Sequence, residues 1–188
     1  MNGGRLSRRA LVVGALTLTA TGCASGGWQV GRSLDPRFMR QRVRYETGEK
    51  TGTIVVDTSQ RFLFVVENDG EAIRYGVAVG EEGLTYKGRA TVGRKAEWPA
   101  WTPTARMIER KPRLAQYAAG VPGGPDNPLG ARALYLYSGG QDTHFRIHGT
   151  NEPWLIGQAV SNGCVRLTND NITELYDETP LGTPVLII

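Results

Sequence analysis

Short runs of hydrophobic residues, separated by polar turn residues, open the globular part of the chain. Residues 53–57 and 61–67 are rich in Val, Ile and Phe and predict two strands. Residues 67–71 read Glu-Asn-Asp-Gly-Glu, and Asn, Asp and Gly tolerate the positive φ of a hairpin turn. Residues 72–79 then alternate apolar and other side chains, which predicts a third strand with one buried face. The pattern therefore predicts an antiparallel meander that is mostly core.

Residues 80–130 show a different pattern, because prolines punctuate them. Six of the ten prolines of the chain fall in this stretch, namely Pro99, Pro103, Pro112, Pro122, Pro125 and Pro128. Only brief helical turns fit between them, and residues 104–109 suit one such turn, since it can end before Pro112. A loop of this length inside a compact domain is usually a lid or a binding loop, or is disordered. Trp98 and Trp101 argue against disorder.

The last third of the chain returns to regular patterns. Residues 133–137 and 143–149 predict two strands, and residues 183–188 predict a closing, fully apolar strand. Residues 152–160 suit a short helix with Pro153 in its first turn. Residues 168–178 suit a second helix, capped by Thr168 or Asn169, with apolar side chains at helical spacing. The apolar positions of this helix are Ile172, Leu175 and Tyr176.

Composition supports one domain of mainly β structure with short helices. The chain has 188 residues, and its 25 glycines and 10 prolines favour strands and loops over a helical bundle. The net charge of +4 comes largely from the N-terminus, where residues 1–22 hold three arginines and no acidic residue. The remainder has 19 basic and 18 acidic residues, without a basic stripe carrying interleaved aromatics. This balance argues against a nucleic-acid partner.

The N-terminus has the organisation of an export signal. Residues 5–9 are positively charged, and residues 11–20 form an apolar run too short to span a bilayer. Thr21 and Gly22 are small residues directly before Cys23, as in a lipoprotein signal, in which Cys23 carries the lipid. The paired arginines Arg8 and Arg9 also resemble a twin-arginine signal, and a cleaved secretory signal with Cys23 merely nearby is the simpler alternative.

This organisation predicts an export signal at 1–22, a polar tether at 23–51 and a catalytic domain at 52–188. It predicts an exported protein of the periplasm or cell envelope, anchored to a membrane through Cys23. A pair of cysteines in an exported protein would normally suggest a disulfide. If Cys23 carries a lipid, Cys164 is the one thiol left, and a lone thiol in an oxidising compartment suggests a reactive group.

The candidate chemistry lies around this thiol. His148 precedes Cys164 by sixteen positions and is one of only two histidines in the chain, so it is the best candidate for a base. Gly163 permits a tight turn that exposes the sulfur, and the N–H groups of Gly163 and Cys164 are candidate oxyanion donors. If the segment is extended, Arg166 shares a face with Cys164, where it can lower the thiol pKa or hold a substrate carboxylate.

Three segments and two motifs resemble the L,D-transpeptidase (YkuD-like) family. The motifs are His148-Gly149-Thr150 and the run Ser161-Asn162-Gly163-Cys164-Val165-Arg166. Residues 98–103, 123–130 and 148–153 also look like family segments, and the resemblance covers residues 52–188. It implies a mixed β-sandwich or barrel-like catalytic domain without a cofactor or a metal. The implied partner is a stem peptide of peptidoglycan.

The resemblance also implies a reaction. Such enzymes cleave the bond between diaminopimelate and D-alanine in a stem tetrapeptide, form a thioester on the cysteine, and pass the acyl group to an amine of another stem or of a protein. Cys164 is then the nucleophile, His148 the base and later the acid, and the carbonyl of Gly149 orients the imidazole. Ser161, Asn162 and Gly163 shape the turn, and Arg166 binds the substrate end. Asn162 departs from the commoner histidine, which leaves His148 as the base.

Three alternatives remain open from the sequence. The same domain can act as an L,D-carboxypeptidase if water reaches the thioester first, or it can be a non-catalytic lipoprotein that binds the wall. A metal hydrolase would use Asp142, His144, His148 and Cys164 as ligands, although their spacing matches no known zinc motif. His144 and Arg146 are candidate residues of the cleft, since alternate positions of one strand face the same side. The oligomeric state is left open.

Overall fold

The structure, a computed structural model, describes residue 1 and residues 34–188. The predicted export signal, Cys23 and the tether up to residue 33 lie outside the described residues. Nine strands form one sheet in the order β1-β4-β3-β2-β11-β6-β7-β8-β10. They are β1 (Gln41–Arg44), β2 (Ile54–Asp57), β3 (Phe62–Val66), β4 (Glu71–Gly76), β6 (Gly88–Glu97), β7 (Arg132–Ser138), β8 (Gln141–His148), β10 (Val165–Arg166) and β11 (Pro184–Ile187). β5 (Val79–Gly80) and β9 (Ala159–Ser161) form a separate parallel pair.

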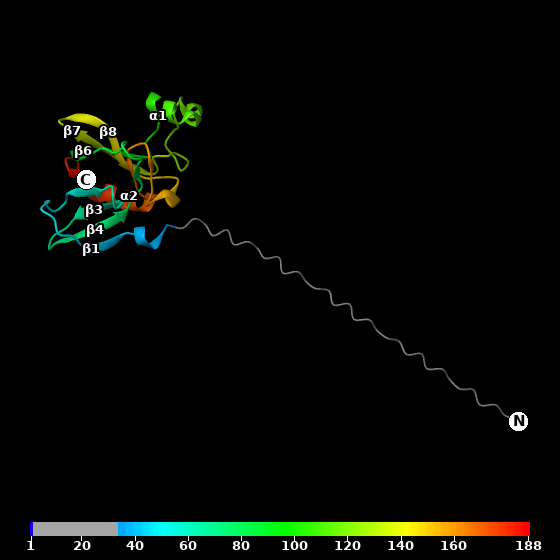
Figure 1. Ribbon diagram of the computed structural model, residues 1–188, viewed down its shortest axis with the longest axis horizontal. Coiled ribbons are helices and arrows are strands. Elements are labelled where there is room, and N and C mark those ends of the chain that lie inside the picture. The colour runs from blue at the N-terminus through cyan, green and yellow to red at the C-terminus, as the bar shows by residue number, and fades with distance from the viewer. Residues whose placement is uncertain (2–33) are drawn as a thin grey trace. The chain divides into compact units, whose positions relative to one another are not determined.

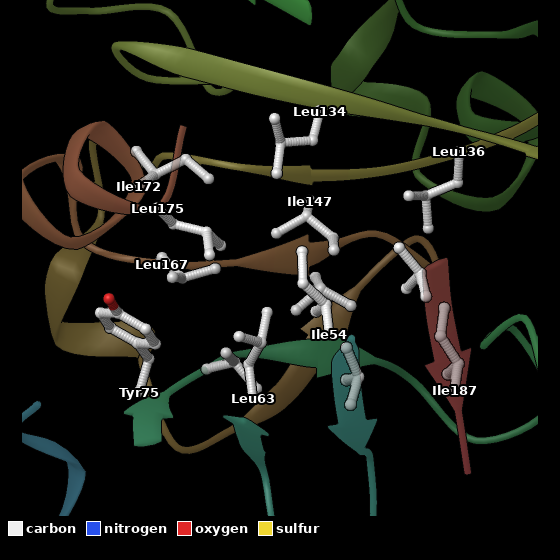
Figure 2. Packing of buried hydrophobic residues seen from close by; sticks show 14 of the residues in the cluster. Ile54, Leu63, Tyr75, Leu134, Leu136, Ile147, Leu167, Ile172, Leu175 and Ile187 are labelled. Atoms are coloured by element: carbon white, nitrogen blue, oxygen red, sulfur yellow. The ribbon is translucent and has the colours of Figure 1, made fainter. Parts of the chain in front are cut away.

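The sheet folds over on itself, so that its two halves enclose the main core. In Figure 1, β1, β3 and β4 lie in one half, and β6, β7 and β8 lie in the other. Figure 2 shows Leu63 and Tyr75 pointing from the first half toward Leu134 and Leu136 of the second, with Ile147 between them. All five side chains are fully buried. Most strand pairs are antiparallel, while β2–β11 and β8–β10 are parallel. The prediction of a mainly β, mixed sandwich-like or barrel-like domain with short helices is confirmed.

The helices are few and short. α2 (Asn169–Glu178) closes one side of the core with Ile172 and Leu175, as predicted (Figure 2). It begins at an N-cap, since the Thr168 hydroxyl accepts a hydrogen bond from the Asn171 N–H at 3.3 Å. α1 (Ala105–Arg110), capped by Thr104, matches the predicted helical turn. The 3₁₀ helices are η1 (Pro36–Phe38), η2 (Pro112–Tyr117) and η3 (Pro153–Leu155).

Part of the predicted tether belongs to the domain. β1 pairs with β4 at the edge of the sheet, and Phe38 of η1 is buried against the outer face of the first half. This second cluster consists of Phe38, Val55, Phe62, Phe64, Val66, Ala72, Ala78 and Ile156. The unbroken apolar runs of β2 and β3 bury both faces of the strands, so the outer face needs a cover. Residues 34–45 supply it, and the structure therefore differs from the prediction of a tether extending to residue 51.

Two other predictions of local structure are wrong. Residues 88–97 form the ten-residue strand β6 and not a loop, because the prolines of that stretch begin only at Pro99. Few β6 residues are buried, Ala90 and Val92 among them, so its apolar signal is weak. Of the helix predicted for residues 152–160, only the single turn η3 forms. Residues 159 and 160, the last of the predicted helix, belong to the strand β9. In residue 1 and residues 34–188, no helix is long and apolar enough to cross a membrane.

Candidate active site

The candidate residues lie on one face of two adjacent strands. β8 and β10 run parallel, with Ile147 beside Val165 and His148 beside Arg166. Ile147 and Val165 point into the main core. Because side chains alternate across a strand, His148 and Arg166 take the opposite face, and Cys164 joins them directly before β10. The charge of Arg166 acts on the Cys164 thiol, which agrees with the predicted common face of these two residues.

A hydrogen-bonded turn holds the thiol. The Ser161 hydroxyl donates to the carbonyl oxygen of Cys164 at 2.6 Å and accepts from the Gly163 N–H at 3.0 Å. Gly163 has φ +125°, and a Cβ there would lie 2.6 Å from the Leu84 carbonyl oxygen and 2.6 Å from the Phe145 ring. Only glycine fits this position without strain.

The same contacts correct the predicted oxyanion donors. The Gly163 N–H is already engaged by Ser161, so it is not a free donor in this conformation. The Cys164 N–H makes no hydrogen bond to any residue that the structure describes. Of the two predicted donors, only Cys164 is therefore available to a developing negative charge.

His148 is buried and held by main-chain carbonyls. Its Nδ1 lies 2.6 Å from the carbonyl oxygen of Gly149. With the proton on Nδ1, that N–H donates to Gly149, and Nε2 keeps the lone pair that a base requires. Burial, aided by the Arg166 charge, lowers the pKa of His148 to about 3, while the main-chain carbonyls of Gly149 and Leu129 oppose this shift. The imidazole is therefore neutral at neutral pH.

The surroundings of Cys164 work against its thiolate form. Burial raises the pKa of Cys164, although the main chain of Arg146 and the charges of Arg146 and Arg166 act in the opposite direction. Arg166 thus lowers the thiol pKa, as predicted, but burial outweighs it. Among the described residues, no hydrogen bond joins the His148 ring to the sulfur. Both pKa shifts favour the uncharged forms of the thiol and the imidazole over a thiolate–imidazolium ion pair.

Arg166 faces a cavity of about 640 Å³. Its Nη1 lies 3.5 Å from a carboxylate oxygen of Glu152, and its buried Nε has no hydrogen-bond partner among the described residues. Buried guanidinium groups normally use all their donors, and this Nε is an exception. The cavity is also lined by Asn162 of the thiol turn, by the aromatic residues Trp101, Tyr117 and Trp154, and by charged residues that include Glu81, Lys111 and Arg113.

The segment predicted as a lid or binding loop borders this cavity. Trp101 pairs with Val121 through two main-chain hydrogen bonds, which close the base of the segment that carries α1 and η2. Lys111 forms an ion pair with Glu81, and the Arg110 guanidinium lies 3.5 Å from the Asn162 side-chain oxygen. The segment is therefore ordered and tied to the thiol turn.

The two predicted cleft residues differ in placement, because His144 is displaced while Arg146 lies close enough to the Cys164 thiol for its main chain and charge to act on it. The β7–β8 register shifts between Tyr135 and Tyr137, and His144 lies in this irregularity with φ +62°. The alternation of side chains is broken there, so the expected common face of His144 and His148 does not follow; the His144 residue is exposed. Arg146 makes a two-pronged ion pair with Asp142, at 2.7 and 2.9 Å, and stacks on Tyr135.

The zinc alternative finds no support in this geometry. Within residues 34–188, no group of three or more His, Cys, Asp or Glu side chains is arranged to hold a metal ion. Asp142 is occupied by Arg146, and the His144 main-chain N–H donates to it at 2.8 Å. The four proposed ligands therefore do not converge.

The family profile of the L,D-transpeptidase catalytic domain matches residues 51–187, which includes every residue of this site. The chain belongs to the L,D-transpeptidase catalytic domain family. The matched range nearly coincides with the domain predicted at 52–188. Residues 34–50 lie outside the matched range, although β1 is part of the sheet and Phe38 packs against it.

Curated relatives agree with this assignment. The chain is 39% identical over 139 residues to a probable L,D-transpeptidase, ErfK/SrfK, of Escherichia coli K12; the match covers 72% of this chain and 43% of that protein. It is 36% identical over 140 residues to another probable L,D-transpeptidase of this organism, YbiS, covering 73% and 44%. The matched region thus spans less than half the length of these two relatives.

Solved structures show the same fold. An L,D-transpeptidase from Mycobacterium smegmatis superimposes with a TM-score of 0.54 at 19% identity, covering 72% of this chain and 58% of that one. A structure from Brucella melitensis, described as that of a probable carnitine operon oxidoreductase, is 51% identical, with a TM-score of 0.55 and coverage of 84% and 98%. Its description differs from those of the curated relatives, whereas the family profile and the curated relatives agree.

Two contributors to the L,D-transpeptidase site escape prediction from sequence. Leu129 acts on His148 through its main-chain carbonyl, and such a role leaves no signal in the side chain. Glu152 pairs with Arg166, fourteen positions away. A buried arginine needs a counter-charge, and Glu152 is an acidic residue in the segment between the two motifs. This is the one sequence signal that points to Glu152.

Proposed function

We propose that this chain is a peptidoglycan L,D-transpeptidase that works through a thioester on Cys164. The observation that carries the proposal is the pairing of His148 with Arg166 across two parallel strands, with Cys164 directly before β10 and within reach of the Arg166 charge. The cavity of about 640 Å³ beside Arg166 offers room for a peptide. The substrate is the stem tetrapeptide, and the bond broken is the one between diaminopimelate and D-alanine.

The first half of the reaction forms the thioester. His148 Nε2 takes the thiol proton as the sulfur attacks the diaminopimelate carbonyl carbon. The oxygen of the tetrahedral intermediate is stabilised by the Cys164 N–H. The intermediate collapses to the thioester, the bond to the D-alanine nitrogen breaks, and the His148 imidazolium gives its proton to the leaving amine. Gly149 orients the ring throughout, and the turn formed by Ser161, Asn162 and Gly163 presents the sulfur.

The second half transfers the acyl group. An amine of another stem, or of a protein, attacks the thioester carbonyl and loses a proton to His148. The carbon–sulfur bond then breaks, and the proton returns to the sulfur. Arg166 binds the substrate end, an assignment that its position in the lining of the cavity supports. His148 starts neutral, so its free ring nitrogen can take a proton, and the Cys164 thiol becomes nucleophilic when it loses that proton.

Intact mass after mixing the full chain with a carbapenem tests the mechanism. Carbapenems acylate the nucleophile of this family, and a similar L,D-transpeptidase has been crystallised in complex with imipenem. We expect one adduct on the parent chain and none on Cys164→Ala. The absence of an adduct on the parent chain, or an equal adduct on the variant, contradicts the proposal.

A second assay separates transfer from hydrolysis. A stem tetrapeptide is incubated with the chain, with and without an amine acceptor, and the products are identified by mass. We expect the cross-linked product when the acceptor is present, together with released D-alanine. If only the tripeptide appears at every acceptor concentration, the chain is an L,D-carboxypeptidase. If neither product appears, the chain is instead a wall-binding protein without catalytic activity.

The proposal includes export and anchoring through the N-terminus. Arg8 and Arg9, the apolar run at 11–20 and the small residues before Cys23 support a lipoprotein that works in the cell envelope, where peptidoglycan lies. Fractionation of cells making the full chain is expected to place it in the membrane fraction. Cys23→Ser is expected to release it from that fraction, whereas an unchanged distribution contradicts a lipid on Cys23.

A further inference from the structure

Asn169 occupies an unusual position behind the proposed base. It is the first residue of α2, and its side-chain oxygen Oδ1 accepts a hydrogen bond from the Ala131 N–H at 2.9 Å. The helix end does not require this side chain, since Thr168 already caps it. Asn169 therefore joins α2 to the start of β7 and leaves the capping to its neighbour.

The contact lies at the closest approach of two main-chain segments. A Cβ added to Gly130 would lie 2.2 Å from Asn169 Oδ1 and 2.6 Å from the carbonyl carbon of Gly149. A Cβ added to Gly149 would lie 2.3 Å from the same Oδ1 and 3.0 Å from the Ala131 nitrogen. Such distances exclude any side chain at either glycine. Asn169 Oδ1 thus lies where residues 129–131 meet residues 149–150.

These two segments supply the two carbonyls that act on His148. The Gly149 carbonyl oxygen lies 2.6 Å from the ring, and the Leu129 main-chain carbonyl acts on it from the other segment. A shift of either segment changes the orientation of the imidazole and its exposure to water. Ala131 is buried, so the loss of Asn169 would leave its N–H without a partner and favour such a shift.

We propose that Asn169 is a positioning residue for the His148 base, acting through the main chain of Gly149 and of residues 129–131. The assignment rests on the proposed function, because it gives the base a support that lies outside the reacting groups. In other catalytic triads a carboxylate orients the histidine directly. Here Asn169 orients His148 indirectly, because it fixes the main-chain carbonyl that holds the ring.

The test compares Asn169→Ala with two matched variants of the full chain. Asn169→Asp keeps an oxygen at Oδ1 and is expected to behave like the parent. Asp170→Ala alters the exposed neighbour on the same helix turn and serves as the control. The readouts are the carbapenem acylation rate as a function of pH, and the NMR titration of the two histidine rings.

We expect Asn169→Ala to slow acylation roughly 10- to 100-fold, because small misplacements of catalytic groups cost rate on this scale. We also expect the pKa of His148 to rise toward the ordinary histidine value, because water reaches a ring that burial had kept neutral. The acid limb of the rate profile should then move to higher pH.

Parent-like acylation together with a parent-like His148 titration in Asn169→Ala overturns the proposal. A slower variant whose His148 titration and pH profile match the parent also overturns it, since that result indicates a purely structural role. If the alanine variant does not fold, Asn169→Ser takes its place with the same readouts, because its hydroxyl is too short to reach the Ala131 N–H. If the parent shows no acylation, the proposed function fails, while the His148 titration still tests the positioning.

Discussion

The two halves of the sheet differ in regularity, although they share one core. In the first half, the β1–β4, β2–β3 and β3–β4 ladders run without a register shift. In the second half, the β6–β7 and β7–β8 ladders both shift, at Val92–Arg94 and at Tyr135–Tyr137. β-Bulges bend a strand and redirect its side chains, and they concentrate near active sites.

The difference shows how one sheet serves two purposes. The regular half is covered on both faces, by the main core and by residues 34–45, so its side chains serve packing. The irregular half has its core on one face and Cys164, His148 and Arg166 on the other. Strand alternation places His148 and Arg166 on this face, the Gly163 turn brings Cys164 to it, and the β7–β8 register shift displaces His144 from it. Substitutions in the two halves should therefore affect different measurements.

The largest effect is expected in the irregular half, for His148→Ala. Loss of a general base typically costs roughly 10²- to 10⁴-fold in rate, so acylation by a carbapenem should almost disappear. His144→Ala is the control, because that exposed residue lies in the bulge and should keep most of the rate. Mass spectrometry at fixed times measures both variants. An equal loss for the two histidines would mean that the bulge, and not the base, controls the reaction.

The next largest effect is expected in the regular half, for Phe38→Ala. Phe38 is 4% exposed and packs beside Phe62, with ring centres 5.4 Å apart. Truncation of a buried Phe costs about 3–5 kcal/mol in the free energy of unfolding. Urea unfolding measures the loss, and Met39→Ala, a neighbour that is 50% exposed, should change stability by less than about 0.5 kcal/mol. A similar loss in the free energy of unfolding for the two variants would indicate that residues 34–45 are a tether and not part of the domain.

The pH dependence of Cys164 alkylation sharpens the description of the irregular half. The thiolate is the reactive form, and burial raises the pKa of Cys164 above its ordinary value. The rate with iodoacetamide should therefore keep rising beyond about pH 8.5, where an ordinary cysteine begins to level off. Mass analysis of the Cys164 peptide follows the rate, with a short cysteine peptide as reference. A plateau below pH 7 would instead indicate a thiolate–imidazolium pair at rest.

The smallest effect is expected for an exposed ion pair of the regular half. Arg42 lies 2.6 Å from Glu67 and 3.1 Å from Glu71, and its side chain is 58% exposed. Solvent and salt screen such pairs, so Arg42→Ala should cost less than about 1 kcal/mol in the free energy of unfolding. Acylation should stay at the parent rate. A larger cost that persists in high salt would show that the edge strand β1 needs this residue for packing.

Local pattern predicted the regular parts well. The meander, α2 with its Thr168 cap and the mainly β fold class follow from apolar runs, turn residues and helical spacing, all of which act over a few neighbouring residues. β6 was missed because few of its side chains are buried, and residues 34–45 were missed because their partners are distant in sequence. A pattern along one segment carries little information about what covers it.

The sequence by itself determined the chemistry that is available: one thiol in the domain, a histidine sixteen positions before it, and the motifs that mark the family. Only the tertiary structure decided how these groups behave. The Ser161 hydroxyl engages the Gly163 N–H, the β7–β8 bulge breaks the alternation at His144, and burial keeps the imidazole and the thiol neutral. The physical reason is that hydrogen-bond partners, register and desolvation depend on segments far apart in the chain, as Asn169 illustrates at the junction behind His148.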